Sequence, residues 1–246
     1  MFSPRGRGLE RGWPGRIEGD RVVQLAAQTL QSFFSGGGKP REHAEYPLAE
    51  VDLRPPVLHP PSVRAFSAFR RNDLAFYFSN PAAIYGPDDE IHYPAETQEL
   101  DYELELAAVI GADGRIGGFT VMNDWTARDL LRRELADGLG PAKSKDFATS
   151  LGPILVTPDE FDGASGAVAV RVNGEERWRG DLMEMRSSWE EIVEKAARNT
   201  HLVPGDVIGS GGVDVVERDG PWLQPGDVVA VEHEAIGALR NLIVGR

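Results

Sequence analysis

Glu103 and Glu105, separated by one residue, are the side chains with the clearest capacity for chemistry. They lie in the segment from Asp101 to Gly111, whose apolar residues predict a mostly buried strand. Because side chains alternate faces along a strand, both glutamates are expected to project from the same side. Two like-charged carboxylates on a half-buried face repel each other and resist desolvation. A hard divalent cation would remove both penalties, since Mg²⁺ and Ca²⁺ prefer oxygen ligands.

A third acid follows close by. The segment Gly118–Met122 predicts another strand, which runs into Asn123 and Asp124 and so places a carboxylate at a strand end. For the glutamate pair alone, an exposed strand face with two solvated acids is an equally good interpretation. The aspartate favours a metal site.

Composition excludes several classes of protein. The chain has 246 residues, a net charge of −13 and a sequence pI near 4.9, with no basic cluster longer than Arg132-Arg133. This argues against binding nucleic acid or anionic membranes. There is no cysteine, which excludes disulfides, thiolate metal sites and a cysteine nucleophile. No apolar run approaches a membrane span and the first residues do not form a signal peptide, so we expect a cytoplasmic protein.

The chain divides into two parts near Pro56. Gly15–Leu25 predicts a hairpin around a Gly-Asp turn, and Leu25–Phe34 a short helix that ends at a run of glycines. Asp52–Pro61 is rich in proline and cannot be regular helix or central strand. We therefore predict a small N-terminal hairpin and helix region over residues 1–55 and a larger domain over residues 56–246.

The larger part consists mainly of short strands with turn signals between them. The strongest is Asn173-Gly174, a hairpin turn after the strand Val168–Val172; the other predicted strands include Ala75–Phe78 and Val228–Val231. Two helices are predicted, one from Thr126 or Ala127 to Ala136 and one that begins at Ser188 with a capping box to Glu191. Neither alternates with parallel-strand patterns, which favours a β-rich α+β fold over a doubly wound nucleotide-binding fold.

Four segments in order resemble the fumarylacetoacetate hydrolase family, and the resemblance covers roughly Pro60 to the C-terminus. The segments are Asp101–Glu105 with Val109–Gly111, Gly118–Leu130, Lys143–Asp146 with Leu151–Pro153, and Pro204–Ile208. The resemblance implies a mixed β-sandwich roll closed around a metal site, assembled as a homodimer. It also implies a small 2-oxo or diketo acid as substrate. Members hydrolyse carbon–carbon bonds in such acids, or isomerise, hydrate or decarboxylate them.

By the same resemblance, Glu103, Glu105 and Asp124 are the metal ligands, with Mg²⁺ as the expected ion and Mn²⁺ or Ca²⁺ as alternatives. Three carboxylates leave octahedral positions open for a chelating 2-oxo acid and water. Lys143 corresponds to the family's catalytic lysine, a point charge for the substrate carboxylate or a developing oxyanion. A solvated lysine in a loop is the alternative interpretation of Lys143.

The resemblance further implies substrate-binding residues. Arg128 corresponds to an arginine that orients the substrate carboxylate, with a surface ion pair to Asp129 or Glu134 as the alternative. The remaining substrate-binding residues that it implies are Asp146, Ser210, Gly211 and Gly212.

The chain also departs from the family pattern. Family hydrolases carry a lid with a His and a Glu that activate water, whereas Pro61–Tyr77 has no histidine and a single acid, Asp73. Ala65 stands where relatives place an acid, and Leu131 where a glutamine is frequent. Carbon–carbon hydrolysis is the favoured reaction. The altered lid leaves two alternatives open, namely tautomerisation or decarboxylation at the same metal site, and a homologue that binds metal or metabolite without turnover.

Overall fold

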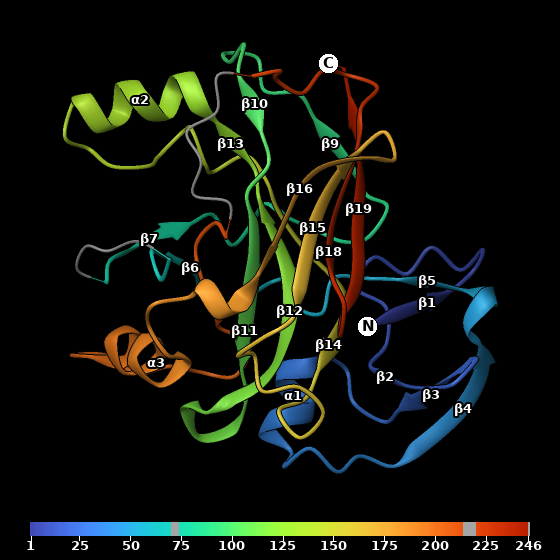
Figure 1. Cartoon of the computed structure of the whole chain (residues 1–246). Coiled ribbons are helices and arrows are strands. Elements are labelled where there is room, and N and C mark those ends of the chain that lie inside the picture. The colour runs from blue at the N-terminus through green and yellow to red at the C-terminus, as the bar shows by residue number, and fades with distance from the viewer. Residues whose placement is uncertain (70–73, 214–219, 246) are drawn as a thin grey trace.

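Two mixed β-sheets make up most of the fold in the computed structural model, which describes residues 1–69, 74–213 and 220–245 (Figure 1). In spatial order the larger sheet contains β7 (Phe76–Ser79), β6 (Val63–Phe66), β17 (Val207–Gly209), β11 (Leu104–Ile110), β12 (Ile116–Asp124), β14 (Thr149–Val156) and β8 (Ile84–Tyr85). The smaller contains β16 (Glu175–Asp181), β15 (Ala167–Val172), β18 (Val228–His233), β19 (Gly237–Val244) and β9 (Glu90–His92).

Both sheets combine antiparallel neighbours with parallel ones. The pairs β6/β17, β8/β14 and β9/β19 are parallel, and the other pairs within these sheets are antiparallel. The two sheets pack against each other, with β18 and β19 in contact with β12 and β19 also in contact with β14 (Figure 1). This arrangement confirms the predicted β-rich α+β class and the mixed sandwich roll.

Alternation along β11 divides its side chains between two cores. Leu104, Leu106 and Ala108 face the smaller sheet and join the larger core cluster. Ala107 and Val109 face the opposite way, into a second cluster that includes residues of the N-terminal helix. Because both faces of this strand are covered by apolar groups, any charged side chain on it lies in a largely dry environment.

The N-terminal region forms small sheets of its own and one short helix. These elements are β1 (Phe2–Pro4) paired with β5 (Val51–Leu53), the sheet of β2 (Gly15–Glu18), β3 (Arg21–Leu25) and β4 (Glu42–Pro47), and α1 (Leu30–Ser35). The hairpin predicted over Gly15–Leu25 is confirmed as β2 and β3. The boundary predicted near Pro56 falls between β5 and β6 and stays a prediction.

The helix α1 begins later than predicted. It starts at Leu30 rather than Leu25, because Leu25 and Ala26 still pair as extended backbone: Leu25 N donates to Pro14 O at 2.9 Å and Ala26 N to Arg41 O at 2.8 Å. Thr29 then caps the helix by accepting from Ser32 N. The apolar residues that favour a helix over Leu25–Phe34 therefore include Leu25, which is the end of β3.

Two longer helices lie outside the sheets (Figure 1). The helix α2 (Arg128–Ala136) follows β13 (Thr126–Ala127), which pairs with β10 (Leu100–Asp101). The helix α3 (Trp189–Ala197) begins with the predicted capping box between Ser188 and Glu191. Three short 3₁₀ turns cover Leu48–Glu50, Ala112–Gly114 and Leu182–Glu184. Among the described residues, no helix is long and apolar enough to span a membrane.

Candidate metal centre

The ends of β11 and β12 bring three acidic side chains together. The two strands pair antiparallel with Leu104 opposite Asn123 and Glu105 opposite Met122, and Asp124 N donates to Glu103 O at 3.0 Å. One carboxylate oxygen each from Glu103, Glu105 and Asp124 lies within 4.8 Å of the other two. These three residues are the carboxylate cluster, and the shared side of Glu103 and Glu105 agrees with the prediction from strand alternation.

The neighbouring strand β17 makes room for Glu105. Gly209 pairs with Ala107 of β11, and a Cβ atom on Gly209 would lie 2.2 Å from Glu105 Oε2 and 2.3 Å from Met122 Cε. Gly211 N then donates to Glu105 Oε2 at 2.9 Å. Gly211 has φ +89°, a left-handed conformation that favours glycine. The short strand and the turn after it therefore form one wall of the cluster.

Lys145 supplies a positive charge inside the cluster. Its Nζ donates to Glu103 Oε2 at 2.6 Å and to Asp124 Oδ2 at 2.7 Å, and its side chain is only 4% exposed. A buried ammonium with a carboxylate on two sides offsets much of the desolvation penalty of all three groups. Burial favours a lower pKa for Lys145, but Asp124 and Glu103 outweigh it and raise the pKa.

Arg128 binds the outer side of Glu103. It is the first residue of α2, and its guanidinium donates to Glu103 Oε1 and, at 2.8 Å, to Asp101 Oδ2. The arginine thus joins the cluster rather than forming the alternative surface ion pair. The acids of that alternative have other partners: Asp129 accepts from Thr97 and from Gln98 N, and Glu134 from Ser144.

Tyr77 approaches the cluster from β7. Its hydroxyl donates to Asp124 Oδ2, the same oxygen that accepts from Lys145. The other oxygen, Asp124 Oδ1, is buried and has no hydrogen-bond partner among the described residues. A buried carboxylate oxygen without a donor carries a desolvation penalty that a bound ligand would remove.

The protonation equilibria of the three acids differ. Burial raises the pKa of Glu105 well above its usual value, and the charge of Asp124 raises it further. Burial also raises the pKa of Asp124, against the lowering effect of Lys145. For Glu103, burial is outweighed by Lys145 and Arg128, which lower its pKa to about 2. Both cations pair with Glu103, whereas Asp124 pairs with Lys145 and Glu105 accepts from the Gly211 N–H.

A divalent cation fits this arrangement. The donor set consists only of carboxylate oxygens, which Mg²⁺, Mn²⁺ and Ca²⁺ prefer. Three carboxylates face the two cations Lys145 and Arg128, and Asp124 Oδ1 has no hydrogen-bond partner among the residues that the structure describes. The residues present therefore suit a divalent metal site, and the chemistry of the ligands does not select one ion.

The lysine in the cluster is not the one expected from the sequence. Lys143 has a side chain that is 70% exposed and pairs with Asp146 at 2.9 Å. The two lysines lie in one tight turn, where Lys145 N and Asp146 N both donate to Ala142 O at 3.1 Å. Residues two apart in a helical turn point in nearly opposite directions, so only one of them can face the cluster. The prediction of Lys143 rested on the family resemblance of the segment Lys143–Asp146, and spacing alone does not choose between the two lysines.

The other predicted substrate-binding residues differ in whether they contact the carboxylate cluster. Asp146 faces Lys143, and its Oδ1 is buried without a described partner. The Ser210 hydroxyl accepts from Leu106 N at 3.1 Å and donates to Gly211 O, so it supports the backbone. Gly211 contacts Glu105, and Gly212 follows it directly. Their roles toward a substrate stay predictions.

Sequence reasoning missed Tyr77 as a cluster residue. It lies in a segment predicted only as a strand, although alternation places its side chain on the face opposite Phe76 and Phe78. A single polar hydroxyl on an otherwise aromatic strand is the signal that could have identified it. Asp73, the single acid of the altered lid segment, lies outside the described residues.

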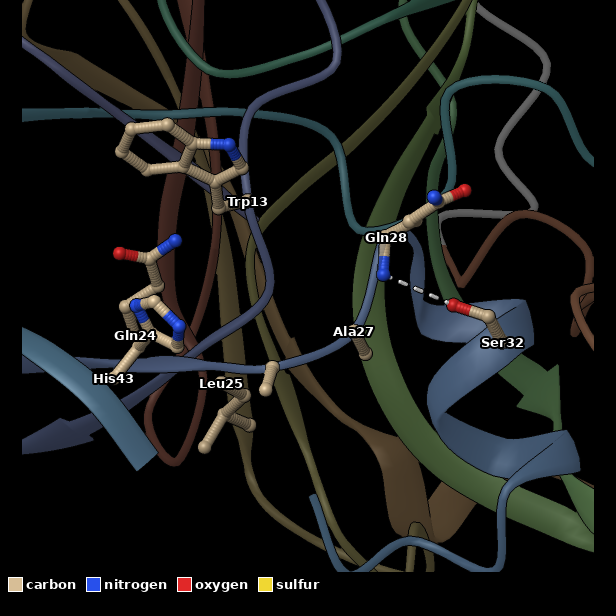
Figure 2. Close-up of a pocket in the computed structure, with 8 residues that line it drawn as sticks. Trp13, Gln24, Leu25, Ala27, Gln28, Ser32 and His43 are labelled. Carbon is tan, nitrogen blue, oxygen red and sulfur yellow. Dashed lines mark hydrogen bonds between the residues drawn. The ribbon is translucent and has the colours of Figure 1, made fainter. Parts of the chain in front are cut away.

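An open depression lies elsewhere, between β3, β4 and α1. Trp13, Gln24 and His43 line one side of it, and the other side holds Ser32, which accepts from Gln28 N at 3.2 Å (Figure 2). None of the predicted site residues lines this depression. The chemistry is therefore concentrated at the carboxylate cluster.

Known proteins share this fold and sequence pattern. A family model described as "Fumarylacetoacetate (FAA) hydrolase C-terminal" matches residues 62–244. The human protein "Oxaloacetate tautomerase FAHD2B, mitochondrial" is 35% identical over 177 residues, which are 66% of this chain and 56% of that protein. The chain thus matches little more than half the length of this curated relative.

Two solved structures are similar over nearly their whole length. "Fumarylacetoacetate hydrolase (EaFAH) from psychrophilic Exiguobacterium antarcticum" has a TM-score of 0.84 and 30% identity, with 96% of each chain covered. The 5-carboxymethyl-2-hydroxymuconate delta-isomerase from Mycobacterium smegmatis has a TM-score of 0.78 and 29% identity, with 95% of this chain and 94% of that chain covered. Together with the family model, these matches show that the chain belongs to the fumarylacetoacetate hydrolase family.

Proposed function

We propose that this protein is a divalent-metal-dependent enzyme that tautomerises or isomerises a small 2-oxo or diketo acid. The observation that carries the proposal is the carboxylate cluster, buried around Lys145, in which Asp124 Oδ1 has no hydrogen-bond partner within the described part of the chain. Glu103, Glu105 and Asp124 would hold the ion. When bound there, the ion supplies a Lewis acid that polarises a keto oxygen of the substrate.

The basic residues of the cluster have roles that follow from their position. Lys145 and Arg128 place two fixed positive charges beside Glu103. Preorganised charge in a site shielded from water stabilises negative charge that develops on a substrate oxygen. Lys145 therefore takes the role that the family resemblance assigned to Lys143, a positive charge for the substrate carboxylate or a developing oxyanion. Arg128 keeps the role of orienting the substrate carboxylate.

Tautomerisation is favoured over hydrolysis by the side chains around the cluster. Hydrolysis needs a group that activates water, and such a group typically contributes about 10²–10⁴-fold to the rate. In the part of the chain that the structure describes, the side chains that hydrogen-bond the three carboxylates are Tyr77, Arg128 and Lys145, none of them a histidine. The human relative is named a tautomerase and the Mycobacterium smegmatis protein an isomerase, which supports the same choice.

Carbon–carbon hydrolysis is the second candidate. It is favoured by the similarity to the protein from Exiguobacterium antarcticum, which is named a fumarylacetoacetate hydrolase. This reaction would require a water-activating base outside the contacts described above, with Asp73, inside the lid segment, and His92 as candidates.

A substrate panel tests the proposal. Metal-free protein is supplied with Mg²⁺ or Mn²⁺ and assayed with oxaloacetate, acetylpyruvate and fumarylacetoacetate, while enol absorbance and cleavage products are followed separately. We expect enol–keto conversion to exceed cleavage, and we expect Glu103→Ala to abolish it together with the binding of Mn²⁺. Cleavage as fast as tautomerisation would instead identify a hydrolase. Tight Mn²⁺ binding without turnover of any compound would support a binding protein.

A further inference from the structure

We propose that Tyr77 is a positioning residue for the metal centre, because its hydroxyl fixes Asp124 in the orientation that directs Oδ1 toward the ion. The inference rests on the proposed metal-dependent function. Tyr77 would not hold the ion itself; it acts through the carboxylate of Asp124, which accepts from its hydroxyl.

A row of small residues lets the tyrosine reach the cluster from the edge of the sheet. Tyr77 pairs with Ala65 of β6, Ala65 with Gly209 of β17, and Gly209 with Ala107 of β11. Directly paired residues project from the same face of a sheet. Neither Ala65 nor Gly209 has a side chain large enough to block the ring, so the phenol can extend across both strands toward Asp124.

The Tyr77 hydroxyl restrains the orientation of the Asp124 carboxylate. Oδ2 accepts from Tyr77 on one side and from Lys145 Nζ on the other, at 2.7 Å from the lysine. The lysine also lies against the tyrosine, with Nζ 5.7 Å from the ring centroid. A carboxylate held by two donors at one oxygen cannot rotate freely, and its second oxygen is then presented in a fixed direction. That second oxygen is the buried, partnerless Oδ1.

The strand that carries Tyr77 also supports Lys145. Ser79, which alternation places on the same face as Tyr77, donates from Oγ to Lys145 O at 3.4 Å, and Asn80 Nδ2 donates to Asp146 O at 3.0 Å. The two donors to Asp124 Oδ2 therefore both depend on β7: Tyr77 lies in this strand, and Ser79 and Asn80 hydrogen-bond the backbone at Lys145 and Asp146. This is the arrangement expected of groups that orient a metal ligand, since such outer partners fix the ligand and tune its affinity.

Tyr77→Phe tests the role, because it removes the hydroxyl and keeps the ring. Mn²⁺ binding to the full chain is measured by isothermal titration calorimetry, and the Mn²⁺ electron paramagnetic resonance spectrum is recorded for each protein. We expect Mn²⁺ affinity to fall about 10–100-fold, as for the loss of other outer-shell partners. The spectrum should change as well, because a reoriented carboxylate alters the ligand field. Tyr85→Phe, on the opposite edge strand of the same sheet, is the matched control and should bind Mn²⁺ as the wild type does.

The outcomes separate this inference from the proposed function. A wild-type protein that binds no Mn²⁺ would overturn the metal-dependent function and the inference with it. A wild-type protein that binds Mn²⁺ while Tyr77→Phe binds it equally well, with an unchanged spectrum, would overturn the positioning role alone. Ala65→Val is a second variant: its larger side chain should displace the ring from Asp124 and weaken Mn²⁺ binding in the same way, and unchanged affinity would count against the role.

Discussion

Lys145 keeps its charge in the protein interior because Glu103 and Asp124 flank its ammonium group. An isolated buried lysine loses its proton readily, whereas this one has a raised pKa because of its two partners. Lys143, two residues earlier, is exposed and pairs with Asp146 at the surface. At the scale of single residues, the surroundings of each lysine decide its chemistry, although the two are alike in sequence.

Substituting each lysine separately tests this assignment. Lys145→Met should lower turnover about 10²–10³-fold, the usual effect of losing a preorganised charge at a developing oxyanion. The metal-free variant should also lose about 3–5 kcal/mol of stability, because Asp124 and Glu103 lose a buried partner. Steady-state kinetics and chemical denaturation measure the two effects.

Lys143→Met serves as the matched control. It removes an exposed ion pair and should change stability by no more than about 0.5 kcal/mol, with turnover close to wild type. A large loss of turnover in Lys143→Met, with Lys145→Met active, would return the catalytic role to Lys143.

Glu105 should make the metal-free protein less stable as the pH rises. Burial and Asp124 raise its pKa in the folded protein above the usual 4.5, so the folded state keeps a proton that the unfolded state has lost. The contribution is fully present below pH 4.5 and is lost as the pH rises through the folded pKa. One full proton corresponds to about 1.4 kcal/mol per pH unit.

Denaturation with a chelator present, at several pH values above 4.5, measures this slope. Glu105→Gln mimics the protonated acid and should flatten the profile, while Mn²⁺ affinity should be strongly reduced. Glu103 contributes in the opposite direction, since its pKa of about 2 gives stability above pH 4.5 that is lost in strong acid. An equally steep slope in Glu105→Gln would assign the proton to another group, with Asp124 the first candidate.

At the scale of elements, the strand β17 shapes the cluster because Gly209 has no side chain. Gly209 lies where any Cβ atom would meet both Glu105 and Met122, and the turn after it supplies the Gly211 N–H to Glu105. The short strand thus combines an open space with a hydrogen-bond donor. Both features depend on glycine, the first on its size and the second on its left-handed backbone.

Gly209→Ala should therefore impair the metal site. The added methyl group forces Glu105 or Met122 to move, at a cost of about 1–3 kcal/mol of stability for overpacking. We expect Mn²⁺ affinity measured by calorimetry to fall, because a Cβ atom at Gly209 would lie only 2.2 Å from Glu105 Oε2. Gly245→Ala, where a Cβ atom meets nothing within 4 Å, is the control and should leave Mn²⁺ affinity unchanged. Unchanged Mn²⁺ affinity in Gly209→Ala would contradict the proposed role of Gly209 in making room for Glu105.

At the scale of the whole molecule, the N-terminal helix covers the face of the larger sheet that also carries Glu105. Phe34 of α1 is buried in the same apolar cluster as Ala107 and Met122. Its ring lies against Gly117, where a Cβ atom would come within 2.6 Å of Phe34 Cζ. The helix α1 and the larger sheet therefore share one core. Homodimer formation, which the family resemblance implies, stays a prediction.

Phe34→Ala should destabilise the protein without changing the cluster. Truncation of a buried phenylalanine costs about 3–5 kcal/mol through lost burial and the resulting cavity. The site of the loss is near Gly111 and Gly117, at the ends of β11 and β12 away from the cluster, so Mn²⁺ affinity of the folded protein should stay near wild type. Phe33→Ala, a half-buried neighbour, should cost less in the same urea titrations. Equal losses in both variants would contradict the packing described for α1.

The sequence by itself determined the features that depend on near neighbours. Alternation predicted that Glu103 and Glu105 share a face, the Asn173-Gly174 pair predicted the turn between β15 and β16, and Ser188 with Glu191 predicted the start of α3. Each signal involves only a few residues, so backbone geometry is enough to read it. The convergence of Asp124 with the glutamates was expected from the family resemblance, and the pairing of β11 with β12 brings it about.

Only the tertiary structure decided which distant side chains meet. Lys145 rather than Lys143 enters the cluster because one tight turn directs the two lysines to opposite sides. Tyr77 reaches Asp124 across strands that are far apart in sequence, which requires the register of β7, β6 and β17 and the small residues between them. Side-chain contacts of this kind depend on strand order and sheet curvature, and no local pattern in the chain encodes either.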